Sequence, residues 1–133
     1  MRGSVKPLHL FLLFVFVTLV VVLGFNQLLT DSNPKMSASK LMHVDFEVFG
    51  RVQGVFFRKY TQSKAKSLDV RGWIRNTQKL TVQGEIEGDI SNVENMKTWL
   101  RTEGSPSSRI DRAVFKNEKE IQEYSYKGFS IKH

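Results

Sequence analysis

The chain has 133 residues, 41% of them hydrophobic, and its 20 lysines and arginines against 13 acidic residues give a net charge of +7. The absence of cysteine excludes disulfides, thiolate nucleophiles and cysteine-ligated zinc or iron–sulfur sites. Once the apolar N-terminal segment is set aside, the remainder suffices for one small core and is too short for Rossmann, TIM-barrel or kinase architectures. The positive charge favours anionic partners such as phosphate esters, nucleic acid or acidic lipid, without choosing among them.

The N-terminal segment consists of a basic region over residues 1–7 and an apolar run over residues 8–25. This order is typical of a secretory signal peptide or of an uncleaved signal anchor. At about 1.5 Å per helical residue, the run approaches the ~30 Å thickness of the hydrocarbon core. We therefore expect a transmembrane helix and membrane association through residues 8–25, with cleavage after Gly24 as the alternative.

Residues 26–40 are rich in Ser, Asn and Asp and predict a linker. The N-terminal segment therefore predicts that the protein is anchored in a membrane or enters the secretory pathway. Translation from Met36 would instead produce an untethered, cytoplasmic form. Neither the orientation in the membrane nor cleavage is decided by the sequence.

The predicted domain covers residues 41–133. Apolar and polar residues alternate over residues 43–49, which is the period of a half-buried strand, and apolar residues then recur at helical spacing over residues 57–68. The remaining expected elements are strands over 70–76 and 80–88 that form a hairpin, a helix over 91–103, and strands over 110–115 and 129–132. The order β-α-β-β-α-β predicts an α+β, ferredoxin-like split βαβ sandwich, with an antiparallel sheet and two helices on one face.

Few side chains in this domain are suited to acid–base or metal chemistry. His43 lies in the first strand and is expected to face solvent, and His133 ends the chain, so both are interpreted as surface residues. Glu85, Glu87 and Asp89 alternate along one strand, for which a solvated face is favoured over a metal site. We therefore predict no metal site.

The most informative stretch is GRVQGVFFR at residues 50–58, between the first strand and the first helix. Two glycines let the backbone approach a ligand, and consecutive N–H groups that end at a helix N-terminus bind anions. Arg58 falls in the first helical turn, where the macrodipole disfavours a cation unless an anion lies between them. The stretch therefore indicates a phosphate site, although an ordinary turn with a surface arginine is the alternative. It lacks the G-K-[ST] ending of a Walker A loop.

A second motif, GWIRNT at residues 72–77, ends the second predicted strand. An asparagine at a strand end commonly forms a turn. Alternatively, the Asn76 amide oxygen could accept a hydrogen bond from a water molecule and hold it in line with a phosphorus atom.

Together with GSPSSRIDR at residues 104–112 and the closing FSIKH, these motifs resemble the acylphosphatase family over essentially all of residues 37–133. The resemblance implies a metal-free and cofactor-free hydrolase, expected to be a monomer, that cleaves the carboxyl-phosphate bond of small acyl phosphates and binds no nucleic acid. It gives catalytic roles to Arg58 and Asn76, and Thr77 would orient Asn76. Phosphate binding is assigned to Gly50, Arg51, Val52, Gln53, Gly54, Val55, Phe56, Phe57 and Arg58.

One residue departs from the family pattern near the site, because Leu80 stands where a glycine is usual just after the hairpin turn. Two alternatives to the enzyme are a non-catalytic phosphate-binding module and an RNA-binding ferredoxin-like module. The RNA-binding class carries an aromatic K/R-G-F-G-F-V-x-F run, which nothing in this chain matches.

Overall fold

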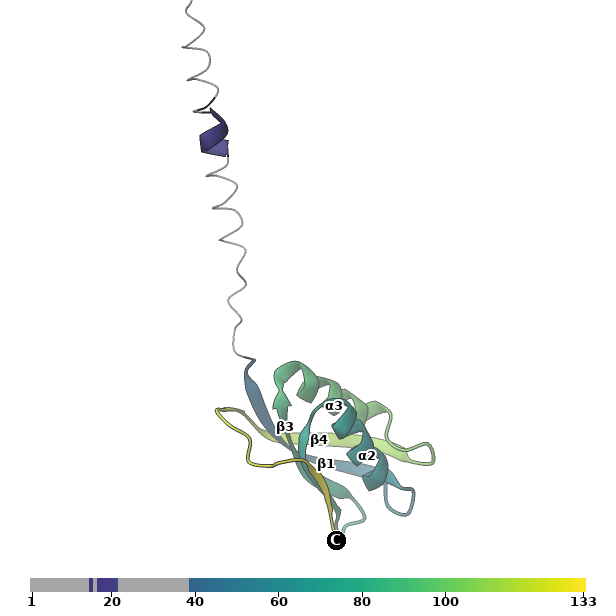
Figure 1. The fold of residues 1–133 in the computed structure, drawn as a ribbon. Helices are drawn as coiled ribbons and strands as arrows, with labels where there is room; N and C mark the ends of the chain where they lie inside the picture. Colours follow the sequence, from purple (N-terminus) through teal and green to yellow (C-terminus); the bar gives the residue numbers. More distant parts are fainter. Residues whose placement is uncertain (1–14, 16, 22–38) are drawn as a thin grey trace, which may run out of the picture. The chain divides into compact units, whose positions relative to one another are not determined.

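The computed structural model describes residue 15, residues 17–21 and residues 39–133. Contacts within the chain divide it into residues 1–37 and 38–133, and the sheet and its helices belong to the second unit. Its elements, in chain order, are β1 (Leu41–Arg51), α2 (Phe57–Ser67), β2 (Arg71–Asn76), β3 (Val82–Asp89), α3 (Ile90–Thr102), β4 (Arg109–Ile121) and β5 (Phe129–Lys132) (Figure 1).

The five strands form one sheet in the order β4-β1-β3-β2-β5. Strand β1 runs antiparallel to β3 and β4, β2 runs antiparallel to β3, and β5 pairs in parallel with β2. The predicted ferredoxin-like α+β class is confirmed, with the correction that the sheet is mixed. The parallel pair arises because the connection after β4 carries the chain to the opposite edge of the sheet, where β5 adds beside β2.

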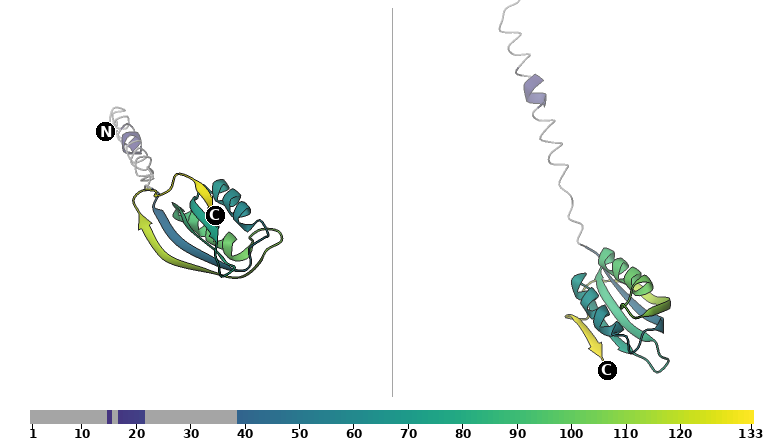
Figure 2. Two further views of the ribbon diagram at one scale, coloured as in Figure 1. Left: turned by 90° about the horizontal axis from the view of Figure 1, so that it is seen from below. Right: turned by 90° about the vertical axis from the view of Figure 1, so that its right-hand side faces the viewer.

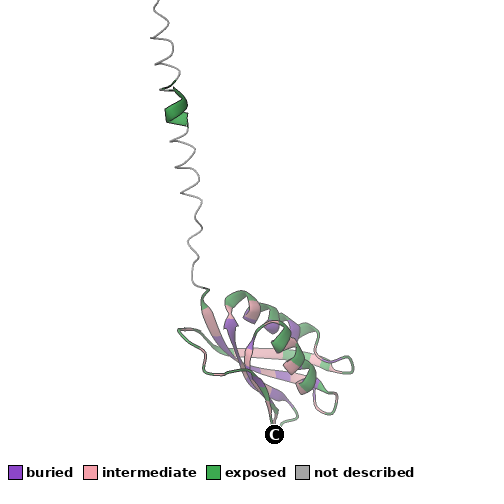
Figure 3. Cartoon of the chain, viewed as in Figure 1, coloured by how far each residue is buried: buried purple, intermediate pink, exposed green. Residues whose placement is uncertain are grey.

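Both helices lie on one face of this sheet (Figure 2). Helix α2 packs over β2 and β5, and α3 packs over β1, β3 and β4. The core between the two layers is built by the alternating strand residues and by the apolar stripe of each helix, and Figure 3 shows these buried positions in purple. Among the fully buried side chains are Val44, Val48, Phe57, Ile74, Ile86, Met96 and Leu100.

The opposite face of the sheet carries no helix within residues 39–133. The connection between β4 and β5 crosses part of this face, since the Ser125 amide donates to Glu87 Oε2 at 2.8 Å. His43 is consequently buried, with 8% of its surface exposed. The prediction of a solvent-facing His43 is therefore wrong, because the covering segment lies far away in the sequence.

Strand β4 extends well beyond the predicted end at residue 115. Its pairing with β1 shifts register between His43 and Asp45, beside Asn117, whose φ is 53°. Such a bulge interrupts the two-residue alternation. The second half of β4 is also charged and exposed, so it carries no apolar periodicity for a sequence analysis to detect.

The predicted transmembrane helix and signal anchor are wrong. In the described part of the chain, no helix has both the length and the apolar character needed to cross a membrane. Within residues 8–25, only residue 15 and residues 17–21 are described, and these are helical. The rest of the predicted anchor lies outside the described residues, so the expected membrane association and secretory placement have no support.

Candidate active site

The loop from β1 to α2 has a backbone that few residue types can adopt. Gly50 has a φ of +134°, and a Cβ atom there would lie 2.1 Å from the Arg109 carbonyl oxygen. Gly54 has a φ of +72°, and Phe56, at the N-cap of α2, has a φ of 60°. Glycine tolerates this left-handed region freely, whereas Phe56 adopts it at a cost. The two glycines of the motif are therefore required by the path of the loop.

The N-terminus of α2 is open to an anion. Phe56 supplies no side-chain cap, and the first turn contains no acidic residue. The first N–H groups of a helix have no intrahelical partner, and the macrodipole places partial positive charge at this end. Arg58, in the same turn, adds a formal positive charge beside these N–H groups.

Arg58 and Asn76 line the same pocket, which has a volume of about 430 Å³. Arg58 comes from the first turn of α2, and Asn76 ends β2. The Oδ1 atom of Asn76 is buried and has no hydrogen-bond partner among residues 39–133. Of the other predicted site residues, the pocket includes Val52, Gly54, Phe56 and Phe57.

Three residues of the pocket were missed from the sequence: Lys59, Ile131 and His133. The closing FSIKH motif lies beside the loop because β5 pairs in parallel with β2. His133 is exposed, as the sequence predicts, and it also lines this pocket. Lys59 follows Arg58 directly and adds a second positive charge to the pocket.

The remaining predicted residues lie around the pocket without lining it. Gln53 holds the loop against the β2–β3 turn, since its Nε2 donates to the carbonyl oxygens of Thr77 at 2.9 Å and Thr81 at 2.8 Å. Gly50 belongs to the end of β1, the Arg51 side chain is exposed, and Val55 is half-buried. These positions shape the loop.

Thr77 contacts Thr81 rather than the Asn76 side chain. The Thr77 and Thr81 hydroxyl oxygens are 2.6 Å apart, and Thr77 Oγ1 also accepts from the Lys79 and Thr81 amides at 3.3 Å. An influence on Asn76 would therefore act through the shape of the turn. That role stays a prediction.

Comparison with known proteins decides the family. The family model described as acylphosphatase matches residues 44–131. Acylphosphatase-2 of Cavia porcellus is 54% identical over 97 residues, which cover 73% of this chain and 98% of that protein. The chain belongs to the acylphosphatase family. Acylphosphatase-1 of Gallus gallus is 58% identical over 92 residues, covering 69% of this chain and 93% of that protein.

Solved acylphosphatase structures share the fold. The structure of an acylphosphatase from Coxiella burnetii matches with a TM-score of 0.62 at 28% identity, covering 74% of this chain and 99% of that chain. An acylphosphatase from Bacillus subtilis matches with the same TM-score at 27% identity, covering 69% of this chain and 99% of that chain. These findings confirm the resemblance and do not favour the RNA-binding or non-catalytic alternatives.

Proposed function

We propose that this protein hydrolyses the carboxyl-phosphate bond of acyl phosphates, releasing a carboxylate and inorganic phosphate. The observation that carries the proposal is the meeting of Arg58 and Asn76 in one pocket at the uncapped N-terminus of α2. Membership of the acylphosphatase family supports the same reaction.

The phosphoryl group binds at the N-terminus of α2. Its oxygens accept hydrogen bonds from the free N–H groups of the loop and the first helical turn, and the Arg58 guanidinium donates two parallel hydrogen bonds. Bound phosphate also resolves the unfavourable placement of Arg58 near the positive end of the helix. The charge that develops on the equatorial oxygens during transfer is stabilised by the same donors.

The attacking water is held by Asn76. Its buried Oδ1 accepts a hydrogen bond from the water, which gives this polar atom the partner that no protein group supplies in the described chain. The water oxygen then attacks the phosphorus atom in line with the departing carboxylate. Phosphoryl transfer depends chiefly on such positioning and on charge stabilisation.

The reaction needs no protein acid to protonate the leaving group, because a carboxylate is already weakly basic. An oxygen of the substrate phosphate accepts the proton of the attacking water. His133 lies at the pocket, but this scheme gives it no proton to transfer.

The test is hydrolysis of benzoyl phosphate by the full chain, followed by the loss of the acyl phosphate absorbance. We expect Arg58→Ala and Asn76→Ala each to lower kcat/KM by ~10²-fold or more, by analogy with removal of a charge-stabilising donor. Arg75→Ala is a matched control that also removes one arginine. Arg75 is exposed, does not line the pocket of Arg58 and Asn76, and has its guanidinium carbon 5.5 Å from the centre of the Trp73 ring. Turnover at the uncatalysed rate by folded wild-type protein would refute the proposal.

A further inference from the structure

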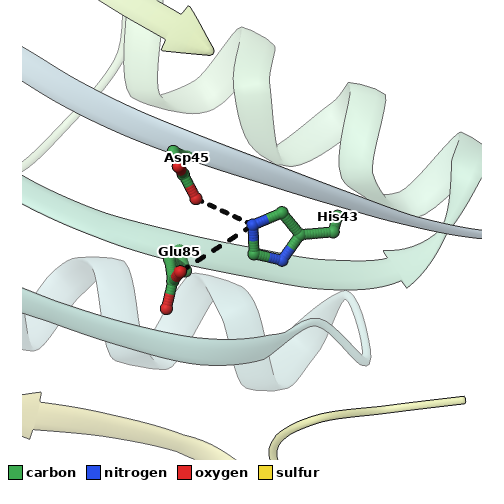
Figure 4. Close-up of side chains that lie close together, drawn as sticks. All are labelled: His43, Asp45 and Glu85. Carbon is green, nitrogen blue, oxygen red and sulfur yellow. Dashed lines mark hydrogen bonds and ion pairs between the residues drawn. The ribbon is translucent and has the colours of Figure 1, made fainter. Parts of the chain in front are cut away.

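The helix-free face of the sheet holds a cluster of one imidazole and two carboxylates. His43 and Asp45 come from β1, and Glu85 comes from β3. Figure 4 shows both carboxylates facing the same ring nitrogen of His43: Nε2 is hydrogen-bonded to Asp45 Oδ1 at 2.7 Å and lies 3.8 Å from Glu85 Oε1. One ligand atom from each of the three residues lies within 4.8 Å of the others.

The second polar atom of each of these three side chains also has a hydrogen-bond partner. His43 Nδ1 is 3.2 Å from Glu87 Oε1, and Glu87 is almost fully buried. Asn117 Nδ2 donates to Asp45 Oδ2 at 2.7 Å, from the bulge in β4. The contacts that hold Glu85 all involve Oε2, which accepts from Trp73 Nε1 and the Tyr126 hydroxyl.

The three atoms that face one another are His43 Nε2, Asp45 Oδ1 and Glu85 Oε1. A histidine that donates its second ring N–H to a carboxylate, and carboxylates that are themselves hydrogen-bonded, are the arrangement that surrounds protein metal ions. The outer partners are Glu87 of β3, Trp73 of β2, Asn117 of β4 and Tyr126 of the connection after β4, so they include neutral donors as well as a carboxylate.

We propose that His43 Nε2, Asp45 Oδ1 and Glu85 Oε1 bind a divalent transition-metal ion of the Zn²⁺ type. One imidazole nitrogen with two carboxylate oxygens suits Zn²⁺ better than Ca²⁺ or Mg²⁺, which prefer oxygen ligands alone. Ligands bound to zinc at ~2.0–2.1 Å in a tetrahedron lie about 3.3 Å apart. To reach this value, the 2.7 Å separation of His43 Nε2 from Asp45 Oδ1 must widen and the 3.8 Å separation from Glu85 Oε1 must shorten, each by about half an ångström.

The site is accessible to an ion and leaves room for a further ligand. The His43 side chain is 10% exposed, against 34% for Asp45 and 26% for Glu85. A pocket of about 520 Å³ includes all three residues, and water would occupy the fourth position.

The ion would act on stability and not on hydrolysis. None of its three ligands belongs to the pocket that contains Arg58 and Asn76. Because it joins β1 to β3, bound metal stabilises the folded state by RT ln(1 + c/Kd), where c is the metal concentration, so the effect grows with the logarithm of that concentration. The proposal is thus independent of the proposed function.

The test is titration of metal-free full-length protein with Zn²⁺ by calorimetry. We expect one ion per chain, a thermal midpoint that rises with zinc, and unchanged kcat for benzoyl phosphate after EDTA treatment. His43→Ala and Glu85→Gln should each weaken zinc binding by at least 100-fold, and Glu87→Gln by ten- to 100-fold. His133→Ala is the matched control and should bind as the wild type does.

Binding of Co²⁺ gives a second measurement, made on the wild-type protein, so it does not depend on whether a variant folds. Paramagnetic cobalt should shift or broaden the imidazole resonances of His43 at one equivalent, before those of His133. Less than one-tenth of an equivalent of zinc bound, or an unchanged dissociation constant in folded His43→Ala or Glu85→Gln, would overturn the proposal. Perturbation of His133 before His43 would do the same.

Discussion

Leu80 is one of four non-glycine residues with a positive φ in the described part of the chain. It lies in the β2–β3 turn with a φ of 67°, and it is 69% exposed. The left-handed region costs an L-residue roughly 1–2 kcal/mol, a cost that glycine does not carry. The Leu80 amide donates to the Thr77 carbonyl at 3.3 Å, which holds the turn in this conformation. The positive φ thus gives a physical reason for expecting a glycine at this position.

Replacing Leu80 by glycine and by alanine separates backbone strain from side-chain loss. Both variants remove the same exposed side chain, but only Leu80→Gly removes the strain. Glycine loses roughly 0.5–1 kcal/mol more conformational entropy than alanine on folding. We therefore expect Leu80→Gly to be more stable than Leu80→Ala by about 0.5–1 kcal/mol, or several degrees in thermal midpoint for a domain of this size.

Gln78 provides the matched control, because it lies in the same turn, is exposed and does not have a positive φ. There the order should reverse, with Gln78→Ala more stable than Gln78→Gly by about 0.5–1 kcal/mol. Urea denaturation followed by circular dichroism measures all four variants. Equal or greater stability of Leu80→Ala relative to Leu80→Gly would refute the strain argument.

Three further predictions concern the loop, the pocket and helix α3. Gln53→Ala should lose about 1–3 kcal/mol of stability in urea denaturation and raise KM, because it removes both side-chain hydrogen bonds that hold the phosphate loop to the turn. His133→Ala should change kcat less than about threefold, since the leaving carboxylate needs no acid; a loss of 10²-fold would assign His133 a catalytic role. Burial alone would lower the pKa of Lys97, but its hydrogen bonds to Glu118 and Glu94 raise that pKa above 10.5. Lys97 therefore contributes roughly 1 kcal/mol to the free energy of unfolding, measured as the difference in stability from Lys97→Met. This contribution is complete below pH 10.5 and is lost as the pH rises through the folded-state pKa. A stability difference between the two proteins that grows with pH would contradict this sign.

The sequence alone determined the order of the helices and strands and the glycine positions of the loop between β1 and α2. Alternation over residues 43–49 and the helical stripe over residues 57–68 each specify one buried face, and burial of that face is what forms the element. Gly50 and Gly54 could be recognised because the loop requires backbone angles that other residues resist. The motifs at residues 50–58, 72–77, 104–112 and 129–133 together sufficed to identify the family.

Only the tertiary structure decided what lies beside these elements. Asn76 meets Arg58 because β2 and α2 pack together, and His133 joins them because β5 pairs with β2. His43 is buried because the connection after β4 crosses the face that alternation marks as polar. A local pattern records which side of a strand is apolar, but it carries no information on which distant segment covers the other side. The turn between β1 and α2 could therefore be predicted from neighbouring residues, whereas the cluster at His43 depends on strands and a connection that only the folded chain brings together.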